Sequence, residues 1–173
     1  MRWINFSPVE ATKITGVEQL TLRTWRTRGF LPGYDDKEFY SGVSPRELIQ
    51  LHIIRMMAEE LTTALRVASE IADIVSLVVL RHALNLPHVV AVQGTSLKAG
   101  SLDLISTGIT SRFALGSPHE DGPKTGGHKS AMKVIFTSDL DRSAGKLMGF
   151  YILDLKTIAR KLVEKTDKPW VHI

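Results

Sequence analysis

The sequence of 173 residues predicts an α+β fold, with a helical N-terminal part and a C-terminal part that contains strands. Three observations lead to this prediction. Two Ser-Pro-x-Glu motifs, at Ser7 and Ser44, have the form of a capping box that starts a helix. A long apolar stretch with helical spacing precedes Pro87. After Pro87, runs rich in Val and Ile are typical of strands.

The first motif predicts a short helix from Pro8 to about Ile14, ending before Gly16. A second helix is expected from about Glu18 to Arg28, closed by Gly29, where a left-handed conformation is easily adopted. Two short helices separated by a Thr-Gly turn are a helix-turn-helix candidate.

Residues 30–43 contain Pro, Gly and Asp around a Phe-Tyr pair and predict a short, irregular hairpin. The second capping motif predicts a helix over 45–60, and Thr62 is expected to cap a further helix over 63–84. The break at Pro87 then divides the chain into residues 1–61, 62–86 and 87–173.

The last of these regions predicts several strands and one helix. The expected strands are 88–92, 102–105, 112–115, 133–137, 150–154 and 170–173, and the helix covers 155–165 with Asp154 as its cap. Residues 116–130 are expected to form a polar, Gly-rich loop.

The composition excludes several classes of protein. The chain has no cysteine, so disulfides, thiolate metal sites and a cysteine nucleophile are excluded. No apolar run is long enough for a membrane span, and the first residues lack the apolar segment of a secretory signal. A cytoplasmic protein with no membrane partner is therefore expected. The net charge of +4 is weak evidence for a nucleic-acid partner, because residues 1–60 carry 8 basic and 8 acidic side chains.

An ordered set of motifs runs through residues 6–32, FSPVEATKITGVEQLTLRTWRTRGFLP. The set comprises Phe6-Ser7, Ala11, Thr15-Gly16-Val17, Thr21-Leu22-Arg23, Trp25 and Gly29-Phe30-Leu31. With these motifs in this order, about residues 6–75 resemble the mercury-resistance-regulator (MerR) family of winged helix-turn-helix DNA-binding proteins. The resemblance implies a DNA-binding domain over 1–61 and a dimerisation helix over 62–86 that forms an antiparallel coiled coil.

The resemblance also implies that Arg23 contacts DNA from the second helix. Arg23 and Arg26 are three residues apart and so are neighbours on a helix that could enter the major groove. The full set of expected DNA-binding residues is Thr15, Thr21, Arg23, Thr24, Arg26, Arg28, Lys37 and Tyr40. Trp25 is expected to pack in the core. The wing is acidic, with Asp35, Asp36 and Glu38, which opposes phosphate contact.

These observations favour a sequence-specific transcriptional regulator that binds an inverted repeat in double-stranded DNA as a homodimer and associates with the nucleoid. Two alternatives stay open: a recombination directionality or architectural factor, and a protein-interaction module whose helix-turn-helix does not bind DNA. Residues 87–173 would serve dimerisation, a partner or an effector.

Other chemistry has little support in the sequence. Residues 122–130 nearly match a phosphate-binding loop, but His128 separates the last glycine from Lys129. His119, Glu120, Asp121 and His128 lie within residues 116–130 and form a weak metal-ligand pattern. We expect no enzyme, no metal and no cofactor.

Overall fold

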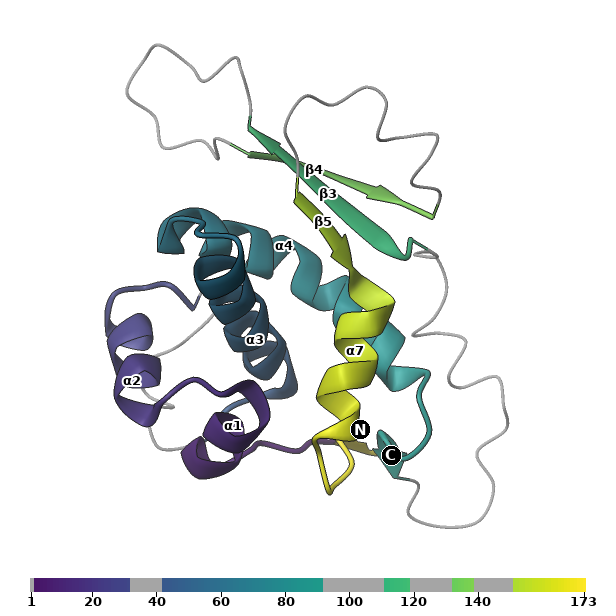
Figure 1. Ribbon diagram of the computed structural model, residues 1–173. Coiled ribbons are helices and arrows are strands. Elements are labelled where there is room, and N and C mark those ends of the chain that lie inside the picture. The colour runs from purple at the N-terminus through teal and green to yellow at the C-terminus, as the bar shows by residue number, and fades with distance from the viewer. Residues whose placement is uncertain (1, 32–41, 92–110, 119–131, 139–150) are drawn as a thin grey trace.

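The computed structural model describes residues 2–31, 42–91, 111–118, 132–138 and 151–173, and its fold class is α+β (Figure 1). The helices in this part of the chain are α1 (Pro8–Thr15), α2 (Gln19–Thr27), α3 (Pro45–Glu60), α4 (Leu65–Leu84) and α7 (Leu155–Glu164). The strands are β1 (Arg2–Trp3), β2 (Val90–Ala91), β3 (Phe113–Pro118), β4 (Met132–Thr137), β5 (Tyr151–Asp154) and β6 (Val171–His172).

Both capping boxes predicted from the sequence are present. The hydroxyl of Ser7 accepts a hydrogen bond from the backbone N–H of Glu10, whose carboxylate in turn accepts one from the N–H of Ser7. Ser44 and Glu47 repeat the arrangement at the start of α3. Asp154 caps α7 as expected, accepting from the N–H of Thr157 at 3.1 Å.

The predicted start of α4 is wrong by two residues. Thr62 was expected to cap a helix from residue 63, but it adopts a positive φ of 49° and its hydroxyl donates to the carbonyl of Leu61. The N–H of Thr63 donates to the carbonyl of Met57, which extends the end of α3. The helix therefore begins at Leu65, after a residue that makes no side-chain cap.

Strand β3 is the centre of an antiparallel sheet with the order β4-β3-β5. It continues to Pro118, which pairs with Met132, so the first three residues of the expected loop 116–130 belong to a strand. These three residues are extended because they pair with β4, and the local sequence does not reveal that pairing. The rest of that loop, with its phosphate-loop and metal-ligand patterns, and the expected strand 102–105 lie outside the described residues.

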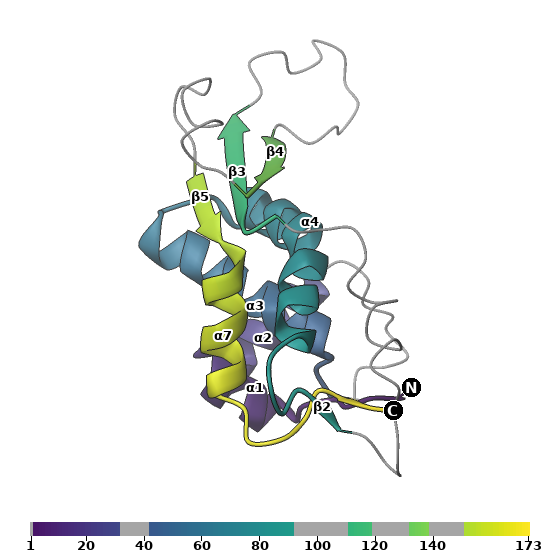
Figure 2. The same ribbon diagram turned by 90° about the vertical axis from the view of Figure 1, so that its right-hand side faces the viewer.

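A second, small sheet joins the two ends of the chain. Strand β6 pairs antiparallel with β1 and parallel with β2, in the order β1-β6-β2. Figure 2 shows both termini beside β2. Strand β1 was not predicted from the sequence, because a segment of two residues is too short to show a periodicity.

Helices α3, α4 and α7 surround the hydrophobic core. The core contains residues from both sides of Pro87, including Leu51 of α3, Val75 of α4 and Leu162 of α7, none of which is exposed. A polar cluster also ties α3 to α4: the carboxylate of Asp73 accepts from Arg46 at 2.7 Å and from Gln50 at 3.1 Å. One continuous core thus spans the expected boundary between residues 1–86 and 87–173, and the division into domains stays a prediction.

Candidate nucleic-acid interface

The turn between α1 and α2 depends on Gly16. Its φ of 75° lies in the left-handed region, and a Cβ at this position would collide with the guanidinium group of Arg55. Arg55 also donates from Nη1 to the carbonyl of Thr15 at 2.8 Å. The turn is therefore held against α3, which fixes the direction in which α2 leaves it.

Thr15 is a structural residue, which corrects its assignment to the DNA-binding set. Its side chain is buried; Oγ1 donates to the carbonyl of Ala11 at 2.7 Å and accepts from the N–H of Val17 at 3.2 Å. The hydroxyl is therefore engaged within the turn and turned away from solvent.

One face of α2 anchors the helix to the protein. Leu22 and Trp25 are buried in the core, as expected for Trp25. After the helix, the N–H of Phe30 donates to the carbonyl of Trp25, and the carbonyl of Phe30 accepts from the hydroxyl of Ser69 on α4 at 2.6 Å. These contacts fix α2 to the protein along its buried face and at its C-terminal end.

The structure also corrects the assignment of Arg26. Its side chain is only 3% exposed and forms an ion pair with Glu47 of α3, with 3.0 Å between Nη2 and Oε1. Nη2 also donates to the carbonyl of Gly42 at 2.9 Å. Spacing placed Arg26 beside Arg23, but a step of three residues rotates a side chain by about 60°, enough to turn it from the surface into the protein. Arg26 anchors α2 and cannot reach a groove.

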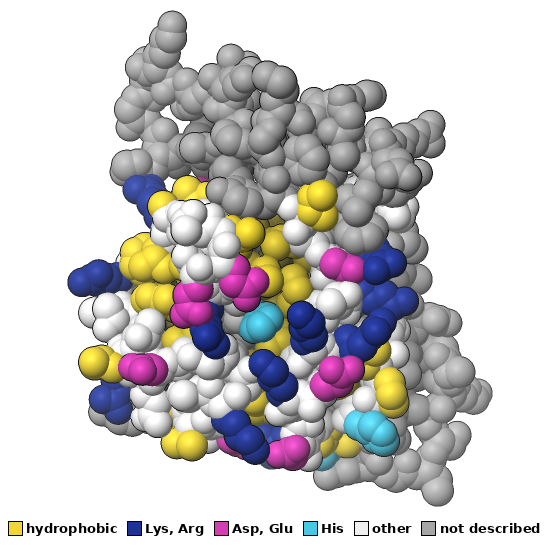
Figure 3. Space-filling view, viewed as in Figure 1, with side chains coloured by type: hydrophobic (Ala, Val, Ile, Leu, Met, Phe, Trp, Pro, Cys, Tyr) yellow, Lys and Arg dark blue, Asp and Glu magenta, His cyan; other side chains and the backbone are white. Residues whose placement is uncertain are grey.

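The outward face of α2 is polar and basic. Arg23 and Arg28 are exposed, and neither forms an ion pair with any described residue. Thr21 and Thr24 are half-buried at the edge of this face, and the hydroxyl of Thr24 donates to the carbonyl of Leu20. Figure 3 shows basic side chains along the margin of the molecule where α2 lies.

Two polar residues on this face were absent from the expected set. Gln19 and Thr27 lie one turn before and one turn after Arg23, and both are exposed. The i±4 spacing could have identified them, because it places all three side chains on one stripe. Leu20, at 72% exposed, lies beside the stripe. Lys37 and Tyr40, the expected wing contacts, lie outside the described residues.

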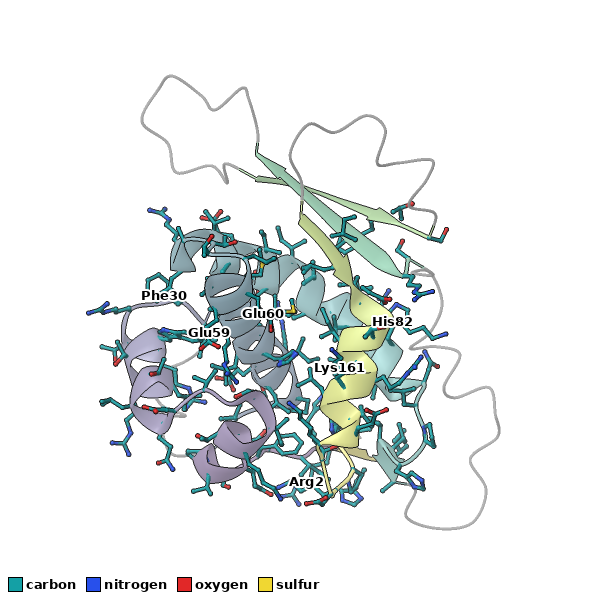
Figure 4. All side chains as sticks on the ribbon, in the orientation of Figure 1. Arg2, Phe30, Glu59, Glu60, His82 and Lys161 are labelled. Atoms are coloured by element: carbon teal, nitrogen blue, oxygen red, sulfur yellow. The ribbon has the colours of Figure 1, made fainter. Side chains whose placement is uncertain are left out.

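A separate hollow of about 380 Å³ lies between α3 and α7, beside the end of α1. Glu59 and Glu60 of α3 and Lys161 of α7 line it (Figure 4). His52 lies within it, and burial together with the positive charges of Lys165, Arg55 and Lys161 lowers the pKa of His52 to about 4. The histidine is therefore neutral at physiological pH.

Within residues 2–31, 42–91, 111–118, 132–138 and 151–173, no group of three or more His, Asp or Glu side chains is arranged to hold a metal ion. Within the same ranges, no helix combines the length and apolar character needed to cross a membrane. No protein-family model matches the chain, and neither does any curated protein.

Proposed function

We propose that the chain is a sequence-specific transcriptional regulator that binds double-stranded DNA through α2, as a homodimer. The observation that carries the proposal is the outward stripe of Gln19, Arg23 and Thr27 with Arg28 beside it, on a helix that has no acidic residue. Arg pairs bidentately with guanine or with phosphate, and Gln pairs with adenine, so this stripe has the chemistry of a recognition helix.

The anchoring of α2 supports the same proposal. The buried Arg26–Glu47 pair and the Trp25 contact fix the rotation of the helix about its own axis. The stripe is thereby presented to solvent in one orientation before any partner arrives, which lowers the entropy lost on binding. Leu20 at the edge of the stripe could contact the methyl group of a thymine.

A stripe on α4 supports the homodimer. Ile74 and Leu77 are 40% and 48% exposed. On the same face of the helix, Glu70 lies one turn before Ile74 and Arg81 lies one turn after Leu77. Antiparallel pairing of two copies about an axis between residues 75 and 76 places Ile74 opposite Leu77 and Glu70 opposite Arg81. Apolar contact at the centre and opposite charges at both ends make this face self-complementary.

The function can be tested by selection from a pool of random duplexes over a series of salt concentrations. An enriched inverted repeat, with affinity falling steeply as salt rises, is the expected result. Strong bending of the bound duplex with no enriched sequence would indicate an architectural factor instead. Flat salt dependence and no enrichment would overturn DNA binding and point to a protein-interaction module.

The interface can be tested with Arg23→Ala and a matched control, Lys156→Ala, which removes an exposed positive charge from α7. Loss of a bidentate base contact should weaken specific binding by about 10- to 100-fold. The control should bind as the parent does. Equal losses in both variants would mean that only overall charge matters and that α2 is not the reading helix.

The dimer can be tested by measuring mass in solution for Leu77→Glu and for Val9→Glu, which alters an exposed apolar residue on α1. The α4 variant should be monomeric and the α1 variant dimeric. A dimeric Leu77→Glu protein would exclude this face as the subunit contact.

A further inference from the structure

The segment Thr166–Pro169, between α7 and β6, links two parts of the molecule. One side of it contacts α1 and the residues just before α1. The other side forms a wall of a cleft of about 760 Å³, which is lined by residues of the end of α7 and of the chain that leads from α4 into β2. The cleft falls in the size range of small-molecule sites.

On the side of α1, Lys168 is the central residue. Its ammonium group lies 2.8 Å from Oε1 of Glu10, donates to the carbonyl of Asn5 at 3.3 Å and stands 4.8 Å from the centre of the Phe6 ring. The hydrogen bond from Lys168, with that from the backbone of Ser7, lowers the pKa of Glu10 to about 2. Lys168 therefore contacts the carboxylate that completes the capping box of α1.

Trp170, which directly follows the segment, also contacts the residues before α1. Its ring is fully buried and meets the ring of Phe6 edge-on, with 6.3 Å between ring centres. Its backbone N–H donates to the carbonyl of Val89, and its carbonyl accepts from the N–H of Ile4. Lys168 and Trp170 therefore both connect the chain around Thr166–Pro169 to the residues at the start of α1.

On the side of the cleft, the walls are largely apolar, with Leu86, Val90 and Val163 among them. Arg160 and Glu164 of α7 provide charge, together with Lys168 and Asp167 of the linking segment. Lys168 and Asp167 are already paired, with Glu10 and Lys13 respectively. Arg160 forms no ion pair with any described residue, and its five donors in a planar fork suit a carboxylate.

From this arrangement we propose that the cleft binds a small amphipathic carboxylate, with its apolar body against Val163 and Val90 and its carboxylate on Arg160. A bound ligand packs against Thr166–Pro169 and restrains that segment, and through Lys168 it steadies the capped end of α1. The cleft is thus an effector site. Its influence on DNA affinity rests on the proposed function of α2, whereas ligand binding and the restraint of α1 do not.

The test uses the full chain and three probes of equal length: octanoate, octan-1-ol and octylamine. Isothermal titration should show octanoate binding about tenfold more tightly than the alcohol, because the charge-assisted bond to Arg160 adds to the same apolar contact. Arg160→Gln should abolish this difference. Lys156→Gln, which removes a charge from the same helix outside the cleft, should leave it intact.

Hydrogen exchange provides the second measurement, and it involves no DNA. Octanoate should slow exchange of the α1 amides in the parent protein and have no such effect in Val163→Phe, which fills part of the cleft. Tighter binding of octylamine, or unchanged octanoate binding by Arg160→Gln, would overturn the carboxylate site. Unchanged α1 exchange with octanoate bound would overturn the link to α1. Failure of DNA binding alone would affect only the proposed function.

Discussion

Two regions of the molecule differ in how their residues are used. In α1 and α2, most side chains are at least partly exposed: each helix buries three residues, which in α2 are Leu22, Trp25 and Arg26. In α3, eight side chains are buried, and α4 buries ten. The first region exposes polar and basic side chains, whereas the second contains most of the apolar surface whose burial stabilises the fold.

The difference shows how a helix with a largely solvent-facing surface can still be held in one orientation. Helix α2 contributes Leu22 and Trp25 to the core, and the buried Arg26–Glu47 ion pair connects it to α3, which contributes many more core residues. Orientation thus depends on a few specific contacts, and stability depends on many apolar ones. Substitutions should separate these two roles.

The largest expected effect is from Glu47→Ala, at the contact between the two regions. It removes the carboxylate that faces the buried guanidinium of Arg26 and also breaks the capping box of α3. Breaking a buried ion pair from one side typically lowers the free energy of unfolding by about 3 to 5 kcal/mol. Arg23→Ala, on the exposed face, should change it by less than about 0.5 kcal/mol. Chemical denaturation of both variants measures the difference.

A double variant sharpens that prediction. In Arg26→Met with Glu47→Leu, neither charge remains, so most of the stability should return. Equal stability of the double variant and Glu47→Ala would mean that the ion pair is not what connects α2 to α3.

The next effect compares two apolar residues. Ile54 on α3 is fully buried, and Leu20 on α2 is 72% exposed. Ile54→Ala should lower the free energy of unfolding by about 2 to 5 kcal/mol, because it removes buried methyl groups and leaves a cavity. Leu20→Ala should have almost no effect on stability. A large loss from Leu20→Ala would contradict the exposed position of this side chain.

The third prediction concerns the dependence of stability on pH. Because the pKa of His52 falls from 6.5 to about 4 on folding, the unfolded chain takes up a proton in this range and the folded chain does not. Stability is then complete above about pH 6.5 and falls as the pH drops towards 4, by about 3 kcal/mol at most. His52→Gln should flatten this part of the curve.

Glu10, which lies in the first region, should affect the stability of the protein only at lower pH. Its pKa in the folded state is about 2, against a usual value of 4.5, so its contribution is lost only as the pH falls through that lower range. Thermal melting at intervals from pH 7 to 3 distinguishes the two groups. A decline that begins only below pH 4.5 in the parent protein would contradict the role of His52.

The smallest effect compares the two helix caps. Ser7→Ala and Ser44→Ala each remove one side-chain acceptor from a helix start, which typically lowers stability by about 1 kcal/mol. For Ser7 the loss should appear as faster hydrogen exchange confined to α1. For Ser44 it should appear in global unfolding, because α3 is part of the core. Identical exchange patterns in both variants would remove the distinction between the regions.

Local signals in the sequence predicted the helices well. Ser7 with Glu10 and Ser44 with Glu47 marked two helix starts correctly, because a capping box needs only residues three apart. Gly16 was also placed correctly at the end of α1, because a glycine that ends a helix is a local signal. On α2, the sequence identified the exposed arginines, but the DNA-binding role of Arg23 stays a prediction.

Contacts between distant segments could not be predicted in this way. Nothing in the local sequence distinguishes Arg26 from Arg23. Arg26 differs because it pairs with Glu47, which lies 21 residues after it in the chain. Thr15 is likewise buried by the turn and by α3. The pairing of β1 with β6 joins residues at opposite ends of the chain, and no local pattern signals it.

The sheet that joins Arg2 to His172 has a consequence for protein engineering. Since β6 and β1 run antiparallel and end side by side, a short Asn-Gly turn could close the backbone into a ring. New ends could then be opened elsewhere on the surface, giving a circular permutant with the same core. A domain fused to either present terminus would emerge from a single corner, on the side of the molecule away from α2 (Figure 1). Such a fusion would leave the arginine-bearing helix accessible.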